Sequence, residues 1–289
     1  MLELKSISKS FQEDFWKKPS LVLKDVSFSI APQSITGFVG KNGSGKSTTI
    51  KIILGLLRQD GGKVHFQKEL GQNRKETLNN IGYLPESPRF FENLTGRKFL
   101  NYMGRFHHLD RISIESRIDE ISSKFEMGQF LDRKIGKYSK GMRQKIGFIS
   151  SVIHNPKLVI LDEPLSGLDP VARSLFKEYF REIREKGASI FLTSHILEDL
   201  FEVSDEIIKI DQGEVTSGVF EKNIKITLKN NYPNLNDQCI ISITEVGDYL
   251  SIILREHERE EFLIKNNIQS LDIIHISDSV SSILDVGRQ

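Results

Sequence analysis

Apolar runs alternate with helical patterns along most of the chain. Residues 21–30 (LVLKDVSFSI) alternate between apolar and polar, which predicts a half-buried strand, and residues 34–40 (SITGFVG) form a mostly apolar run typical of a buried one. Helical spacing follows over residues 47–57, and further apolar strands are predicted at 157–162 and 188–194. Strands that alternate with helices predict an α/β fold with a mainly parallel sheet.

Two other regions depart from this pattern. Over about residues 94–155 the sequence predicts a helical insertion, with Thr95, Ser113 and Ser139 as the N-cap residues of three helices. Near the C-terminus, short alternating segments predict a small separate α/β domain. The expected domains are therefore residues 1–218 and an accessory domain over residues 219–289.

The composition excludes several classes of protein. The 289 residues carry 40 Lys and Arg against 39 Asp and Glu, and 38% are hydrophobic, so the chain is neither a disordered polyelectrolyte nor a strongly basic nucleic-acid binder. A single cysteine cannot form an internal disulfide, which favours a reducing compartment. The charged N-terminus and the absence of an apolar run of roughly 18 residues lead us to expect a soluble, cytosolic chain.

A glycine-rich segment lies between the second predicted strand and the helix that follows it. It fits the phosphate-binding pattern GxxxxGK(S/T), in which glycines allow consecutive backbone N–H groups to point at phosphate oxygens. In this pattern Lys46 reaches the β- and γ-phosphates and the Ser47 hydroxyl binds Mg²⁺. The candidate binding residues are Gly40, Asn42, Gly43, Ser44, Gly45, Lys46, Ser47 and Thr48.

Two acidic residues end a later apolar strand. Residues 158–161 (LVIL) predict a buried strand, and Asp162 and Glu163 follow at its C-terminal end, where α/β sheets bind their ligands. Asp162 is a candidate for the Mg²⁺ shell. Glu163 is placed to polarise a water in line with the γ-phosphate. Together with the glycine-rich loop, this pair predicts a nucleoside triphosphate hydrolase.

With these ordered motifs the chain resembles the ATP-binding cassette (ABC) ATPases over roughly residues 1–218. The resemblance implies a P-loop, RecA-like core with an antiparallel β subdomain and a helical insertion. It also implies that Phe11 stacks on adenine, although Phe15 and Trp16 are neighbouring aromatic alternatives. The cofactors that it implies are ATP and Mg²⁺.

The family's signature sequence LSGGQ aligns with residues 138–142 (YSKGM). Ser139 and Gly141 match it, whereas Lys140 and Met142 depart from it. A hydroxyl, backbone amides and the positive end of a helix dipole still face a phosphate there. In the family that phosphate belongs to ATP bound by another subunit, so a dimer is implied.

Two further matches and one departure follow from the resemblance. Residues 166–169 (SGLD) look like the loop that couples the two sites of the dimer, and His195 looks like the histidine that contacts the γ-phosphate. Glu86 stands where the family commonly has Gln, close to Mg²⁺ or the attacking water. This difference and the short tail resemble the exporter branch whose ATPase is a separate chain. The tandem His107 and His108 are interpreted as helix surface.

The leading hypothesis is an ATP-hydrolysing subunit of an ABC exporter, peripheral at the cytoplasmic face of a membrane. Its expected partners are an integral membrane permease subunit and a second ATPase subunit, with a homodimer favoured over a heterodimer and no nucleic acid. The permease is expected to dock on a groove bordered by residues 86–94, where Phe90 and Phe91 lie in a loop. The expected catalytic residues are Lys46, Glu163 and His195, and the expected Mg²⁺ ligands are Ser47, Asp162 and Glu86.

Three alternatives compete with this hypothesis. A soluble ABC protein of translation or DNA maintenance is disfavoured because the chain has one cassette and no long heptad segment. An importer ATPase with a regulatory C-terminal domain is disfavoured because residues 219–289 are short for such a domain. A P-loop GTPase is disfavoured because no NKxD-type guanine-reading sequence is present.

Overall fold

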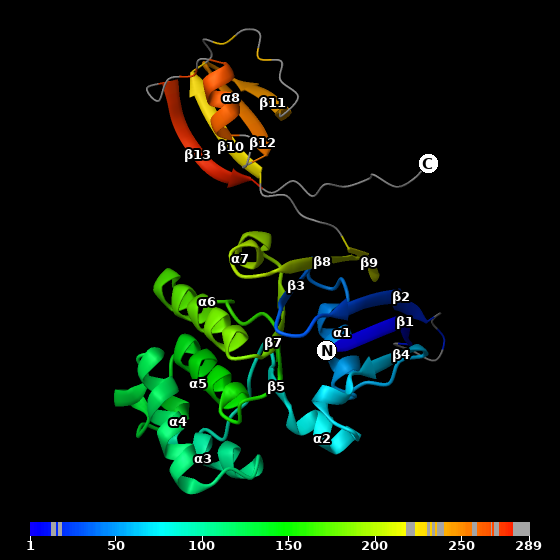
Figure 1. The fold of residues 1–289 in the computed structure, drawn as a ribbon, viewed down its shortest axis with the longest axis vertical. Coiled ribbons are helices and arrows are strands. Elements are labelled where there is room, and N and C mark those ends of the chain that lie inside the picture. Colours follow the sequence, from blue (N-terminus) through cyan, green and yellow to red (C-terminus); the bar gives the residue numbers. More distant parts are fainter. Residues whose placement is uncertain are drawn as a thin grey trace. The chain divides into compact units, whose positions relative to one another are not determined.

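The computed structural model describes residues 1–12, 16, 19–217, 223–229, 232, 235, 240–255, 259–266, 268 and 272–279. The chain divides into two compact units, Met1–Ser217 and Gly218–Gln289. Figure 1 shows the helices and strands of both units. None of the helices in these described ranges is long and apolar enough to cross a membrane.

A largely parallel sheet forms the centre of the first unit, with strand order β5-β6-β7-β3-β8-β9 (Figure 1). Five strands run parallel and β9 pairs antiparallel with β8. Every residue of β3, β6 and β7 is buried, as expected of strands covered on both faces. The predicted parallel α/β sheet is confirmed. The strands are β3 (Ile35–Val39), β5 (Ile81–Leu84), β6 (Leu158–Leu161), β7 (Ser189–Ser194), β8 (Glu206–Asp211) and β9 (Glu214–Ser217).

A second, antiparallel sheet in the same unit has the order β2-β1-β4. Its strands are β1 (Leu2–Phe11), β2 (Ser20–Ile30) and β4 (Gly61–Phe66). The predicted antiparallel β subdomain is confirmed. Phe28 of β2 joins the two sheets, since its ring lies 5.4 Å from that of Phe38 on β3 and 5.6 Å from that of Phe191 on β7. One apolar core therefore supports both sheets and the buried face of α1.

The helical insertion packs beside the parallel sheet. An aromatic cluster connects it to the core: the ring of Phe125 lies 5.3 Å from that of Phe148 on α5 and 4.9 Å from that of Phe176 on α6. The helices of this unit are α1 (Lys46–Ile53), α2 (Arg74–Asn79), α3 (Gly96–Phe106), α4 (Arg111–Lys124), α5 (Lys140–Val152), α6 (Pro170–Glu185) and α7 (Leu197–Phe201), with short 3₁₀ turns at Lys68–Leu70, Gly128–Phe130 and Ile135–Lys137.

Two of the three predicted N-caps are confirmed. The Thr95 hydroxyl accepts from Lys98 N at the start of α3, and the Ser139 hydroxyl accepts from Met142 N at the start of α5. The prediction for Ser113 is wrong, because Asp110 caps α4 and accepts from the backbone amide of Ser113. A carboxylate three residues upstream of Ser113 satisfies two amides of the first turn, which leaves the serine inside the helix.

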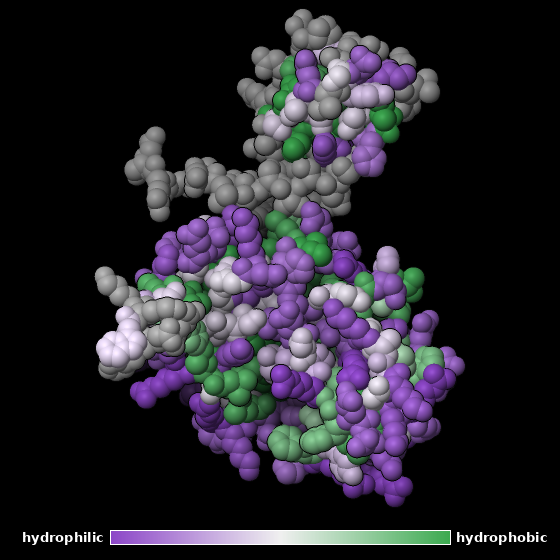
Figure 2. All heavy atoms as spheres, turned by 180° about the vertical axis from the view of Figure 1, so that it is seen from behind, coloured by the Kyte–Doolittle hydropathy of each residue, from purple (hydrophilic) through white to green (hydrophobic). Residues whose placement is uncertain are grey.

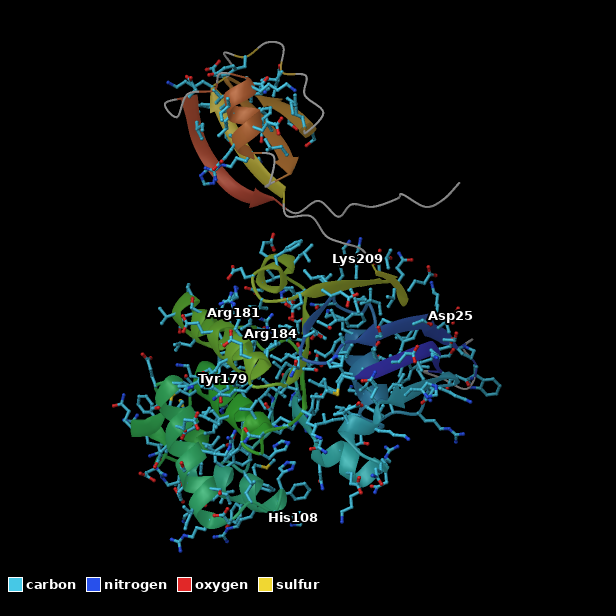
Figure 3. The ribbon with its side chains drawn as sticks, in the orientation of Figure 1. Asp25, His108, Tyr179, Arg181, Arg184 and Lys209 are labelled. Carbon is cyan, nitrogen blue, oxygen red and sulfur yellow. The ribbon has the colours of Figure 1, made fainter. Side chains whose placement is uncertain are left out.

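The interpretation of His107 as helix surface is also wrong. Its ring stacks on that of His154, with centroids 3.5 Å apart and planes inclined by 4°. Burial lowers the pKa of His154 to about 3, and the charge of His107 acts in the same direction. Burial likewise lowers the pKa of His107. The neighbouring His108 is exposed at the end of α3, as expected (Figure 3).

The second unit contains an antiparallel sheet with the order β11-β12-β10-β13 and one helix in its described residues. Its strands are β10 (Asn223–Lys229), β11 (Ile240–Val246), β12 (Tyr249–Arg255) and β13 (Ile273–Ser279), and its helix is α8 (Arg259–Lys265). Phe262 of α8 is 1% exposed and packs with buried residues of β10 and β12, including Ile226 and Ile252. This unit therefore has an apolar core of its own.

Candidate active site

The loop that connects β3 to α1 has the backbone conformation that anion binding requires. Gly43 and Gly45 have φ of 82° and 113°, in the left-handed region that favours glycine. A Cβ atom on Gly40 would lie 2.4 Å from the carbonyl oxygen of Ile210, so a side chain is excluded there. Gly45 is the N-cap of α1 and has no side chain to cap it. The first amides of α1 are thus left for a ligand.

Lys46 lies folded within this loop. Its Nζ atom donates to the carbonyl oxygens of Gly40 at 2.6 Å and Lys41 at 3.3 Å. The same Nζ lies 3.5 Å from Oε1 of Glu163, and both side chains are less than a tenth exposed. A buried ammonium held mainly by neutral carbonyls is poised to exchange them for a stronger anionic partner.

A threonine on β7 orients both acidic residues that follow β6. The Thr193 hydroxyl donates to Oδ1 of Asp162 at 2.8 Å and accepts from the backbone N–H of Glu163 at 2.9 Å. Asp162 and Glu163 are 3% and 7% exposed, so these bonds fix their position. Sequence reasoning missed Thr193. The available signal was a polar residue near the end of an otherwise apolar strand.

Glu163 connects the three loops of the site. Its Oε2 lies 2.8 Å from Nδ1 of His195, which follows β7. With the carboxylate ionised, Nδ1 carries the hydrogen and donates it. Glu163 itself has a φ of 50°, in the left-handed region, which is a strained backbone conformation for a non-glycine residue and is typical of functional sites. Within the described residues, Glu163 Oε1 and Ser44 Oγ are buried without a hydrogen-bond partner, as expected where a polar ligand belongs.

A cleft of about 350 Å³ opens over this arrangement. Phe11 lies at its rim, 39% exposed, with Lys9 Nζ 5.5 Å from the ring centroid. Trp16 is 91% exposed and does not line the cleft, and Phe15 lies outside the described residues. The lining residues are Phe11, Val22, Asn42, Gly43, Gly45, Lys46, Ser47, Thr48, Glu86 and Glu163.

The oxygen donors around the cleft suit magnesium. Ser47 and Glu86 line it, and Asp162 lies beside Glu163 at the end of β6. Mg²⁺ prefers such hard oxygen ligands and takes only one or two carboxylates when phosphates complete its shell. Since Glu163 Oε1 and Ser44 Oγ also lack hydrogen-bond partners in the described chain, the residues present fit a bound Mg²⁺–triphosphate.

The structure does not bring Ser139 and Gly141 to this cleft, because neither residue lines it. Ser139 is exposed at the N-terminus of α5. Further along this helix, Gln144 Nε2 donates to the carbonyl oxygen of Pro164 at 3.1 Å, a contact that sequence reasoning missed. The helix that follows the signature segment thus contacts the loop after Glu163, whereas the Ser139 hydroxyl lies outside the cleft.

The predicted docking loop has one half-buried ring and one exposed ring. Phe90 packs edge-on against Phe99 of α3, with ring centroids 5.2 Å apart. Phe91 is 77% exposed. On the face drawn in Figure 2, hydrophilic side chains predominate and hydrophobic ones form separate groups. Phe91 is therefore the more accessible of the two rings.

Comparison with known proteins identifies the family. Residues 23–166 match the family model described as "ABC transporter". The chain is 32% identical over 217 residues to the ABC transporter ATP-binding protein NatA of Bacillus subtilis, covering 74% of this chain and 87% of that protein. It is 35% identical over 219 residues to an uncharacterized ABC transporter ATP-binding protein of Synechocystis, covering 74% of this chain but 61% of that longer protein.

A solved structure of an ATP-binding subunit of an ABC transporter is 30% identical, with a TM-score of 0.67, and the match covers 75% of this chain and 89% of that one. The similar structure and the similar sequences thus cover nearly the same share of this chain, 75% and 74%. The chain belongs to the family of ABC transporter ATP-binding proteins.

Proposed function

We propose that this chain binds Mg²⁺–ATP in the cleft between β3 and α1 and hydrolyses it to drive a membrane permease. The observation that carries the proposal is the convergence of Lys46, Glu163 and His195 from three separate loops, with Glu163 2.8 Å from His195 and 3.5 Å from Lys46. Such a cation, carboxylate and imidazole provide phosphate binding, a base and a group that orients the base.

Each of these residues has a distinct task. Lys46 releases its loop carbonyls and binds the β- and γ-phosphate oxygens. Glu163, held by Thr193 and His195, accepts a proton from the attacking water. Ser47 and Asp162, with Glu86 nearby, would hold Mg²⁺, which would supply positive charge to the phosphates. Phe11 provides a ring for adenine at the rim of the cleft.

The working unit in this proposal is a head-to-tail homodimer. Ser139 and Gly141 lie outside their own chain's cleft, which supports their use on ATP bound by a second copy. Lys46, Glu163 and His195 are all present in this chain, so two copies supply two complete sites. The accessory domain over residues 219–289 has its own core and carries none of these residues.

The proposed setting is the cytoplasmic face of a membrane, with an integral permease bound beside Phe91. Its 77% exposure supports a protein partner at that loop, because a large aromatic ring in water is unfavourable. Glu86 and the short tail support the exporter branch. The competing candidate is a soluble ABC ATPase, which would need no such docking ring.

Calorimetric titration with Mg²⁺–ATP tests the core of this proposal. Wild type is expected to bind tightly and Lys46→Ala to lose that binding, because no other cation lies buried in the loop among the described residues. Lys51→Ala is the matched control, since Lys51 is an exposed lysine on the same helix. Equal affinity of Lys46→Ala and wild type would contradict the assignment of the cleft.

A further inference from the structure

Four cations follow one face of α6, spaced four, four and three residues apart. We call Arg173, Lys177, Arg181 and Arg184 the α6 basic ridge. This spacing places them on one side of the helix, and Figure 3 shows Arg181 and Arg184 on α6. Each contacts the segment that begins with α7, the short helix starting two residues after His195. The ridge therefore fastens the chain downstream of His195 to α6.

The contacts differ along the ridge. Arg173 Nη1 lies 3.2 Å from Oδ2 of Asp199, and Lys177 Nζ lies 3.0 Å from its Oδ1. Asp199 is 6% exposed, so both cations compensate one buried carboxylate. Further along, Arg181 donates to the backbone carbonyl of Glu202 at 2.7 Å, and Arg184 Nη1 lies 2.6 Å from Oδ1 of Asp205. Ion pairs thus occur at both ends of the ridge, and the most buried carboxylate among them is Asp199.

Arg173 also contacts the loop that precedes α6. Its Nε atom donates to the carbonyl oxygen of Leu168 at 3.3 Å. Leu168 belongs to the SGLD loop, and Ser166 of that loop donates its N–H to the carbonyl oxygen of Glu163 at 3.1 Å. One guanidinium therefore bridges the loop attached to Glu163 and the helix that carries Asp199, four residues after His195.

We propose that Arg173 is a positioning residue for ATP hydrolysis, holding the SGLD loop and α7 at a fixed separation so that His195 stays on the carboxylate of Glu163. This inference rests on the proposed ATPase function. A planar guanidinium serves two acceptors at a fixed angle, which a flexible ammonium does not. When the SGLD loop moves, Arg173 passes that movement to the His195 loop.

Steady-state ATP hydrolysis by the full chain tests this role. Arg173→Met is expected to lower kcat at least about 10-fold with KM for ATP within about twofold of wild type, because misplacement of a base by less than an ångström has effects of this order. Arg173→Lys is expected to recover only part of kcat, since it retains a charge for Asp199 but lacks the Nε donor to Leu168. Arg181→Met, the matched control on the same ridge, is expected to keep kcat within about twofold.

A double-mutant cycle separates positioning from stability. Asp199→Asn alone is expected to lower kcat, and its combination with Arg173→Met to lower it by less than the product of the two effects. Three results would overturn the inference and leave the ATPase assignment intact. They are a double mutant whose kcat falls by the full product of the two single effects, an Arg181→Met enzyme that loses as much kcat as Arg173→Met, and an Arg173→Met enzyme with normal kcat. If wild type showed no ATP hydrolysis, or only hydrolysis that persists in Lys46→Ala, both the role of Arg173 and the proposed ATPase function would be overturned.

Discussion

The imidazole of His195 and the carboxylate of Glu163 meet at 2.8 Å between Nδ1 and Oε2. Each residue follows a different strand of the parallel sheet, β7 and β6, and these strands are neighbours paired in register from Leu158 and Ser189. The contact is thus a direct product of strand order. It orients one oxygen of Glu163 and leaves the other facing Lys46.

Glu163→Gln is expected to retain ATP binding but to slow hydrolysis by at least about 10²-fold, or roughly 2.7 kcal/mol in activation free energy, because an amide cannot accept the proton of water. The amide still accepts a hydrogen bond from His195, so the site keeps its shape. Mg²⁺–ATP should then accumulate as a complex of two chains, visible by size-exclusion chromatography. Normal turnover in this variant would show that another group is the base.

Ser139→Ala is expected to weaken the ATP-dependent dimer of the Glu163→Gln background. Removing the hydroxyl also removes the N-cap of α5, which by itself destabilises a helix by about 1 kcal/mol. Thr95→Ala is the matched control, because it removes the N-cap of α3 and leaves the signature segment intact. Equal dimer dissociation constants in the two variants, measured by analytical ultracentrifugation, would refute a role for Ser139 at the partner's nucleotide.

His154→Phe is expected to make stability less sensitive to acid. In the folded chain the pKa of His154 is about 3, whereas in the unfolded chain it is near 6.5, so protonation favours unfolding as the pH falls from about 6.5 toward 3. Between pH 7 and 4.5 this effect amounts to roughly 2 to 3 kcal/mol. Urea unfolding followed by circular dichroism should show a smaller pH difference in the variant. An identical loss of stability in both proteins would mean that His154 does not titrate in this way.

Phe91→Ser is expected to release the chain from its membrane partner without lowering its thermal stability, because the ring is 77% exposed. Phe90→Ser is the contrasting variant. It should lower the melting temperature, since Phe90 packs against Phe99. Fractionation of cells that express each variant checks the first expectation and calorimetry the second. A Phe91→Ser chain that still sediments fully with membranes would place the docking surface elsewhere.

The glycine-rich loop was predictable because its chemistry resides in consecutive backbone groups and needs only local sequence. Glu163 was predictable from the end of one strand. Thr193 was not, since its role depends on β7 lying beside β6, a pairing that apolar runs alone do not specify. The same limit explains the error over His107, whose stacking partner His154 is 47 residues further along the chain.

Helix ends show a different limit. Asp110 and Ser113 are both good N-cap residues, and the choice between them rests on which side chain reaches the free amides, a geometric property of the folded turn. The predicted helix over residues 47–57 ends instead at Ile53, because the chain turns at Gly55 with a φ of 65°. The ends of these helices therefore depend on individual backbone angles, which cannot be predicted from the spacing of apolar residues.

Strand β3 leads into the phosphate-binding loop, yet its neighbours come from the far end of the first unit. It pairs with β7 from Ile190 onward and with β8 from Glu206 onward, although β3 itself begins at Ile35. Ile35 and its partner Ile190 are 155 positions apart in the sequence. More than 150 residues must therefore be synthesised after the start of β3 before this strand can pair with either neighbour. Such long-range pairing is slow to form. We therefore expect chains truncated before β8 to lack an ordered cleft and to gain no stability from added ATP.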